Sequence, residues 1–164
     1  TTAQLVMGDA LAVSLLKLKD FKSSDFAKYH PGGALGKRLY LRVSDIISKN
    51  EKPSVKRDAS IKDVIIEISN KRLGVTAVVD SNNKIIGIIT DGDLRRMLAE
   101  TLDFNSLKAS DIMSASPKTL TSEAMAVEAK ELLEENNISQ VLIEDNNQFS
   151  GVVHIHDLVK EGII

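Results

Sequence analysis

The chain has 164 residues, a formal net charge of −2 and no cysteine, so disulfides and thiolate metal sites are excluded and the length fits one medium domain or two small ones. The near-neutral charge gives no general attraction to nucleic acid or to anionic membranes, and no apolar run approaches the roughly 18–20 residues that span a bilayer. We therefore expect no nucleic-acid or membrane partner, and the lack of cysteine fits a cytoplasmic location.

The first predicted element is a helix over residues 3–19. Apolar residues fill positions 5–16 with only three interruptions. A helix that is apolar around most of its circumference is expected to be buried on most sides. Nothing else in the chain looks like the core that such a helix would join. We therefore interpret residues 1–42 as the C-terminal helix and linker of a larger domain, with an N-terminal arm for self-association as the alternative.

The remainder of the chain repeats itself at an offset of 64–66 residues. The offset drifts by single residues, as expected when loops gain or lose residues. Two copies of about 60 residues would each bury too little surface alone, so we expect residues 43–106 and 107–164 to pack together. The matching segments are VSDII with ASDIM (43–47, 109–113), LGVTAVVD with ISQVLIED (73–80, 138–145), and GIITDGDL with GVVHIHDL (87–94, 151–158).

Each copy predicts the element order β-α-β-β-α. Ser60 can cap the first helix of copy one, with Asp63 at its third position. Two Asn-Asn pairs, 82–83 and 146–147, predict the turns between the last two strands, because Asn tolerates left-handed backbone. The apolar stripes of the two predicted helices consist of Ile61, Val64, Ile65 and Ile68 in copy one and Ala126, Ala129, Leu132 and Leu133 in copy two.

This duplicated order, with Gly-h-h-Thr-x-x-Asp (h, apolar) closing the last strand, resembles a pair of cystathionine-β-synthase (CBS) domains, a Bateman module. The resemblance covers residues 43–164. It implies an α/β (α+β) fold of tandem CBS domains, here preceded by a long N-terminal helix.

The stretch GIITDGDLRR (87–96) places polar residues where a strand runs into a helix. Free backbone N–H groups at a helix N-terminus suit a phosphate, and the Thr90 hydroxyl can donate another hydrogen bond. A carboxylate such as Asp93 can accept from both hydroxyls of a ribose. The alternative is that Thr90 and Asp91 only cap the helix, with Asp93 in its first turn.

In CBS pairs a Thr and an Asp bind the phosphate and the ribose of an adenosyl or related nucleotide between the copies, and these match Thr90 and Asp93. The resemblance therefore implies a nucleotide site made by both copies. The nucleotide-binding residues that we predict are Gly87, Thr90, Asp91 and Asp93 in copy one and His154, His156 and Asp157 in copy two.

The second copy departs from this pattern, because His154 stands at the Thr position and His156 precedes Asp157. A protonated histidine can donate to a phosphate, which would make an altered pocket. Metal ligation by these three residues lacks an evident fourth ligand, and plain interface packing is the remaining alternative. We expect no metal and no pair of identical nucleotide sites.

The string YHPGGALGKRL (29–39) is the most distinctive in the chain. Residues 1–46 are similar to the junction in D-arabinose 5-phosphate isomerases, in which a sugar-isomerase (SIS) domain precedes two CBS domains. His30 matches the active-site histidine of that family. The resemblance implies a parent that interconverts D-ribulose 5-phosphate and D-arabinose 5-phosphate, on the way to the lipopolysaccharide sugar Kdo.

We therefore expect a regulatory CBS pair of such an isomerase. The regulatory ligand would be an adenine nucleotide or CMP-Kdo, and the protein partners would be the SIS catalytic domain and further copies in a homo-oligomer. No catalytic cofactor is expected, and this chain alone lacks a complete acid/base set for catalysis. The alternative is a purely structural oligomerisation module that binds no ligand.

Overall fold

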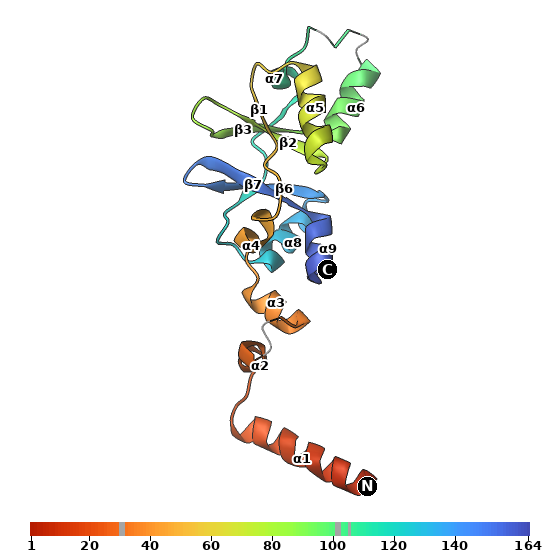
Figure 1. The fold of residues 1–164 in the computed structure, drawn as a ribbon, viewed down its shortest axis with the longest axis vertical. Coiled ribbons are helices and arrows are strands. Elements are labelled where there is room, and N and C mark those ends of the chain that lie inside the picture. The colour runs from red at the N-terminus through yellow and green to blue at the C-terminus, as the bar shows by residue number, and fades with distance from the viewer. Residues whose placement is uncertain (30–31, 101–102, 105) are drawn as a thin grey trace. The chain divides into compact units, whose positions relative to one another are not determined.

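The computed structural model of the protein describes residues 1–29, 32–100, 103–104 and 106–164 (Figure 1). The chain divides into two compact units, Thr1–Leu41 and Arg42–Ile164. Within these described ranges, no helix has both the length and the apolar character required to cross a membrane.

Unit 1 consists of the helices α1 (Thr2–Leu18), α2 (Ser23–Tyr29) and α3 (Ala34–Tyr40). The predicted helix over residues 3–19 is confirmed as α1. None of its residues is buried, and its large apolar side chains are 46–82% exposed. Unit 1 has too little apolar surface of its own to cover α1 on all sides. That α1 is buried in a larger domain therefore stays a prediction. His30, the predicted active-site histidine, lies outside the described residues.

Unit 2 confirms the order β-α-β-β-α in both copies, each preceded by a short helix. Repeat one comprises α4 (Val43–Ile47), β1 (Ser54–Lys56), α5 (Ile61–Lys71), β2 (Val75–Val79), β3 (Ile85–Thr90) and α6 (Asp91–Glu100). Repeat two comprises α7 (Ala109–Ile112), β4 (Ser114–Ala115), β5 (Thr119–Leu120), α8 (Ala126–Glu135), β6 (Gln140–Asp145), β7 (Gln148–His154) and α9 (Ile155–Glu161).

The strands form two sheets, one in the order β1-β2-β3-β4 and one in the order β5-β6-β7. In each sheet the first pair is parallel and the next pair is antiparallel. A parallel pair needs a crossover, and α5 and α8 supply it; an antiparallel pair needs only a hairpin. The predicted helix–strand–strand succession therefore fixes these pairings.

The predicted cap and stripe of α5 are confirmed except at one position. Ser60 Oγ accepts a hydrogen bond from the Asp63 backbone N–H at 3.2 Å. Three stripe residues are buried, but Ile65 is 37% exposed, so the stripe is narrower than predicted. The three buried residues are those that join the core cluster with Val78 of β2. In α8, Leu132 is likewise only partly buried, whereas Ala126, Ala129 and Leu133 are buried.

The two predicted Asn-Asn turns differ in length. Asn146 and Asn147 both have positive φ, 52° and 60°, and join β6 to β7 in a two-residue turn of the primed type. In repeat one only Asn83 of the pair has positive φ, 64°. There the loop is longer, because the Asp80 carboxylate accepts from the backbone N–H of Asn82 and Lys84.

The faces of the two sheets pack against each other, with α5 and α6 on the outer side of one sheet and α8 and α9 on the outer side of the other (Figure 1). Every residue of β2 is buried, because one face meets the opposing sheet and the other meets α5. This explains why its sequence, VTAVV, does not alternate with charged residues. The buried residues between the sheets are Val75, Ala77, Val79, Ile85, Leu142, Phe149 and Val152.

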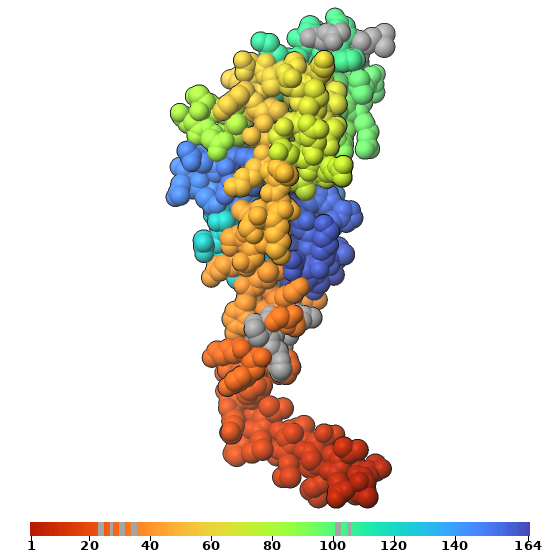
Figure 2. Space-filling view, viewed as in Figure 1, coloured from red at the N-terminus to blue at the C-terminus, as the bar shows by residue number. Residues whose placement is uncertain are grey.

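Backbone contacts also join the hairpin regions of the two repeats, which lie in contact in Figure 2 as the green and blue projections. Phe149 N donates to Asn83 O at 2.8 Å, and Asn83 Nδ2 donates to Phe149 O at 3.1 Å. Asn83 thus both forms the turn and fixes the register between the repeats.

The leading segments of the repeats are exchanged. Val43 N, in α4 of repeat one, donates to Ala124 O of repeat two at 2.9 Å. Reciprocally, Ala109 N of α7 donates to Ala59 O of repeat one at 2.9 Å, and β4 pairs with β3. Each compact half therefore combines the body of one repeat with the leading segment of the other.

Two equivalent glycines make room for this exchange. A Cβ placed on Gly87 would lie 2.9 Å from Met113 Cγ, and one on Gly151 would lie 3.1 Å from Ile47 Cβ. Met113 and Ile47 occupy the same position in the two leading segments. Gly87 is thus required where β3 receives the leading segment of repeat two.

We expect Gly87→Ala to lower the free energy of unfolding by about 1–3 kcal/mol, because the added methyl group overpacks the contact with Met113. Urea denaturation measures this loss. In a Met113→Ala background the same substitution should cost less, because the space is then available. An equal cost in both backgrounds would contradict this explanation.

Candidate functional site

A cleft of about 710 Å³ lies between the repeats. Its volume falls within the range typical of small-molecule sites, about 300–1,000 Å³. One wall comes from the end of β3 and the start of α6, and the other comes from the segments that lead into β5 and β6. The lining residues are Gly74, Ile88, Thr90, Asp91, Gly92, Asp93, Arg95 and Arg96 of repeat one and Ser114–Lys118 and Asn137–Gln140 of repeat two.

The structure brings three of the predicted residues of repeat one into this cleft: Thr90, Asp91 and Asp93. Gly87 does not line the cleft. It lies instead against Met113, which approaches too closely for a side chain at position 87. The strand–helix junction thus faces the second repeat, as a site shared by both copies requires.

Thr90 and Asp93 cap α6 reciprocally. Thr90 donates to Asp93 Oδ2 from its backbone N–H at 2.8 Å and from its hydroxyl at 2.6 Å. In return, Asp93 N donates to Thr90 Oγ1 at 3.3 Å. This is the capping arrangement that the sequence offered as the alternative to ligand binding. The same two side chains also line the cleft.

The Asp93 carboxylate is stabilised in its charged form. Its side chain is only 8% exposed, and this burial alone would raise its pKa. The hydrogen bonds from Thr90 and the neighbouring Arg96 guanidinium outweigh that effect and hold the pKa of Asp93 below its ordinary value. At neutral pH the cleft therefore presents a carboxylate that accepts hydrogen bonds.

Positive charge dominates the rest of the cleft. Arg96 is paired with Asp93, whereas Arg95 and Lys118 have no carboxylate partner among the described residues. Hydroxyl and amide groups from repeat two complete the lining. A site with two unpaired cations, several hydroxyls and the carboxylates of Asp91 and Asp93 suits an anionic ligand that also carries hydroxyl groups.

The cleft residues of repeat two were not predicted from the sequence. Two of them, Ser116 and Asn137, have positive φ, 52° and 51°, a backbone conformation that is unusual for serine and more common for asparagine. The sequence repeat was the signal that could have indicated them, because a site between two repeats must include residues of each. The repeat alone did not show which loops of the two repeats lie together.

Gly74 is a further lining residue that only the structure identifies. It has a φ of 65°, and a Cβ on it would lie 3.2 Å from Asp91 Oδ2 and 3.3 Å from Gln140 Nε2. Gln140 Nε2 also donates to Leu73 O at 3.2 Å. Gly74 thus allows the two repeats to approach at the edge of the cleft.

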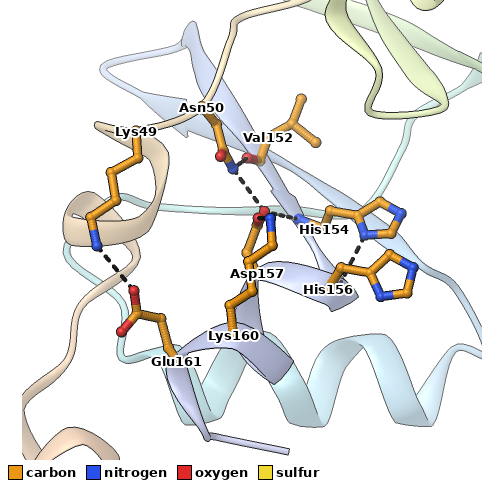
Figure 3. Close-up of polar contacts among 8 residues, drawn as sticks. All are labelled: Lys49, Asn50, Val152, His154, His156, Asp157, Lys160 and Glu161. Carbon is orange, nitrogen blue, oxygen red and sulfur yellow. Dashed lines mark hydrogen bonds and ion pairs between the residues drawn. The ribbon is translucent and has the colours of Figure 1, made fainter.

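The predicted residues of repeat two lie apart from this cleft, at the junction of β7 and α9 (Figure 3). Asp157 Oδ2 accepts from His154 N at 3.0 Å, which repeats the cap of Asp93. The His154 ring takes the place of the threonine hydroxyl, and its Nδ1 accepts from His156 N at 3.0 Å. The two imidazole rings are stacked with their centroids 4.7 Å apart.

Burial lowers the pKa of His154, and the nearby His156 and Lys160 lower it further against the opposing effect of Asp157. His154 is therefore neutral at pH 7, which suits its role as a hydrogen-bond acceptor. Across the part of the chain that the structure describes, no three His, Asp or Glu side chains gather in a way that could hold a metal ion.

Comparison with known proteins gives three findings. The family model described as "CBS domain" matches residues 43–100 and 109–163. Arabinose 5-phosphate isomerase KdsD of Yersinia pestis is 47% identical over the whole chain, which covers 50% of that protein. The same-named protein of Francisella tularensis is 48% identical over 98% of the chain and 49% of its own length. The chain thus spans about half the length of these curated relatives.

A solved structure extends the comparison to the fold. The CBS domain protein PAE2072 from Pyrobaculum aerophilum, in complex with AMP, superimposes with a TM-score of 0.66 at 25% identity. The match covers 72% of this chain and 90% of that one. The fold predicted for residues 43–164 is therefore confirmed.

The lowered pKa of His154 predicts a pH dependence of stability. Between that pKa and the ordinary value near 6.5, the unfolded chain binds more protons than the folded chain, so stability falls as the pH drops through this window. We expect His154→Asn to flatten the pH dependence of the free energy of unfolding between about pH 7 and 5, because asparagine is uncharged and still a good cap.

Urea denaturation at successive pH values measures this effect. At pH 8 the variant and the unmodified protein should have similar stabilities. A slope between pH 7 and 5 that His154→Asn leaves unchanged would show that other groups set it.

Proposed function

Because the chain belongs to the CBS domain family, we propose that its tandem repeat is a regulatory module that binds a nucleotide or a sugar nucleotide between the repeats. The observation that carries the proposal is the cleft of about 710 Å³, where the Thr90–Asp93 junction of repeat one faces the loops of repeat two. The relative that holds AMP, PAE2072, supports a nucleotide as the class of ligand.

Different residues of the cleft bind the phosphate, the ribose and the base of the ligand. The phosphate lies at the N-terminus of α6, near the Thr90 hydroxyl, and its charge is balanced by Arg95 and Lys118. The hydroxyls of the ribose donate to Asp93, which is ionised at neutral pH. The base lies against the apolar part of the lining, Ile88 and Ile138.

Two ligands fit this arrangement. An adenine nucleotide supplies the base, ribose and phosphate. CMP-Kdo supplies the same three groups and adds a carboxylate, for which the cleft offers a second cation. CMP-Kdo would also provide feedback from the activated end product of the pathway that we propose for the parent enzyme.

Regulation follows from the position of the ligand between the repeats. A ligand that contacts both walls favours the packing that fits it, and shifts the population toward that packing by its difference in affinity. The chain enters unit 2 at Arg42, whose guanidinium donates to Glu123 O of repeat two at 2.6 Å. A change in packing therefore acts directly on the segment that continues into unit 1.

The parent that we propose is a cytoplasmic arabinose 5-phosphate isomerase whose catalytic SIS domain forms the other half of its length. The basis is the identity of 46–48% to relatives of that name, half of whose length this chain covers. In such a parent the apolar α1 is covered by the catalytic domain, and His30 serves the isomerisation in a homo-oligomer.

The test of ligand binding is titration calorimetry with AMP and with CMP-Kdo. We expect at least one of them to bind, and Arg95→Gln with Lys118→Gln to weaken it about tenfold, because two charge-assisted contacts are lost. The matched control is Lys62→Gln with Lys84→Gln, which changes the net charge equally outside the cleft.

The outcomes discriminate between functions. Weakening in the first variant alone supports the site. Equal weakening in both variants would show only a general effect of charge. No binding of either ligand to the unmodified protein would favour the structural oligomerisation module.

A further inference from the structure

We infer that Asn50 closes the second strand–helix junction, so that the protein takes one nucleotide per chain, in the cleft at Thr90. This inference rests on the proposed function and specifies its stoichiometry. Asp157 is the carboxylate of repeat two that corresponds to Asp93 of repeat one.

The side-chain amide of Asn50 is hydrogen-bonded to the carboxylate of Asp157 (Figure 3). Asn50 Nδ2 donates to Asp157 Oδ2 at 2.7 Å and to Val152 O at 3.1 Å, so both hydrogens of the amide are used. The same Oδ2 also accepts from His154 N. The Asp157 carboxylate is 12% exposed and that of Asp93 8%, so the two differ in the Asn50 amide and not in burial.

Neighbouring contacts hold the segment of Asn50 in place. Lys49 Nζ lies 3.0 Å from Glu161 Oε1 of α9, and Lys160 Nζ lies 3.9 Å from Asp157 Oδ1 (Figure 3). The hollow that these residues line has a volume of about 160 Å³, against about 320 Å³ for its counterpart at Asp93, Arg96 and Ile112 in the other half of the repeat.

The repeat itself supplies the comparison. At an offset of 66 residues, Lys49 and Asn50 correspond to Ala115 and Ser116. Ala115 and Ser116 are short and line the large cleft, and Asp93 is contacted instead by Thr90 and Arg96 of its own repeat. Of the two longer side chains in the leading segment of repeat one, Asn50 is the one that contacts the carboxylate of the junction.

A ribose that donated to Oδ2 of Asp157 would first have to displace the Asn50 amide. A hydrogen bond to a charged group contributes about 1.5–3 kcal/mol, which corresponds to about a tenfold to hundredfold loss of affinity. The second junction also lacks a hydroxyl, because the His154 ring stands where Thr90 stands in repeat one and its Nδ1 accepts from His156 N.

Calorimetric stoichiometry tests the inference with AMP and CMP-Kdo as probes. We expect one equivalent for the unmodified protein, removed by Asp93→Asn and retained in Asp157→Asn. Asn50→Ser, which installs the residue of repeat two, should add a second and weaker equivalent. Asn50→Ser combined with Asp157→Asn should remove that equivalent again.

Lys49→Ala is the matched control, since it shortens the same segment but keeps the Asn50 amide, and it should still bind one equivalent. Far-ultraviolet circular dichroism and thermal unfolding verify that each variant folds. Two equivalents in the unmodified protein, or one equivalent in a folded Asn50→Ser variant, would overturn the inference while leaving the proposed function standing. No binding of either probe in any variant would overturn both.

Discussion

The packing of one sheet on the other is the interaction on which the whole of unit 2 depends. Each repeat alone is too small to bury its central strand on both faces, and β2 is nonetheless fully buried. Val75 and Ala77 achieve this by meeting Leu142 and Val152 of the other repeat, with each fully buried large apolar side chain contributing about 1.5–3 kcal/mol. Because the sheets pack face to face, the end of β3 lies near the segments that lead into β5 and β6. The cleft is the space between them.

In the site that we propose, the Thr90–Asp93 pair serves stability and recognition with the same atoms. The hydroxyl and the carboxylate satisfy backbone groups at the start of α6, and this keeps Asp93 ionised despite its burial. A buried carboxylate without such donors would take up a proton instead. The cap therefore prepares the acceptor that the proposed ligand requires, and a choice between a structural and a functional role is unnecessary.

The two repeats share a backbone but not a chemistry. Gly87 and Gly151 both receive a leading segment, and Asp93 and Asp157 both cap a helix. The two junctions differ in the side chains that contact these carboxylates. Asn50 of the other repeat donates to Asp157, whereas Asp93 is contacted by Thr90 and Arg96 of its own repeat. A duplicated fold can thus keep its architecture, which many contacts maintain, while in our proposal a single amide changes what one of its junctions can bind.

The sequence by itself determined the repeat, the order of its elements, the cap at Ser60 and the junction at Thr90 and Asp93, because these follow from local periodicity and from the residue types that end strands and begin helices. It also indicated that His154 alters the second junction. Only the tertiary structure decided that the leading segments are exchanged, that Lys118 and Ser116 face Thr90, and that Asn50 is seated on Asp157. The physical reason is that these contacts join residues far apart in the chain. Their geometry depends on how the two sheets pack, which no local pattern encodes.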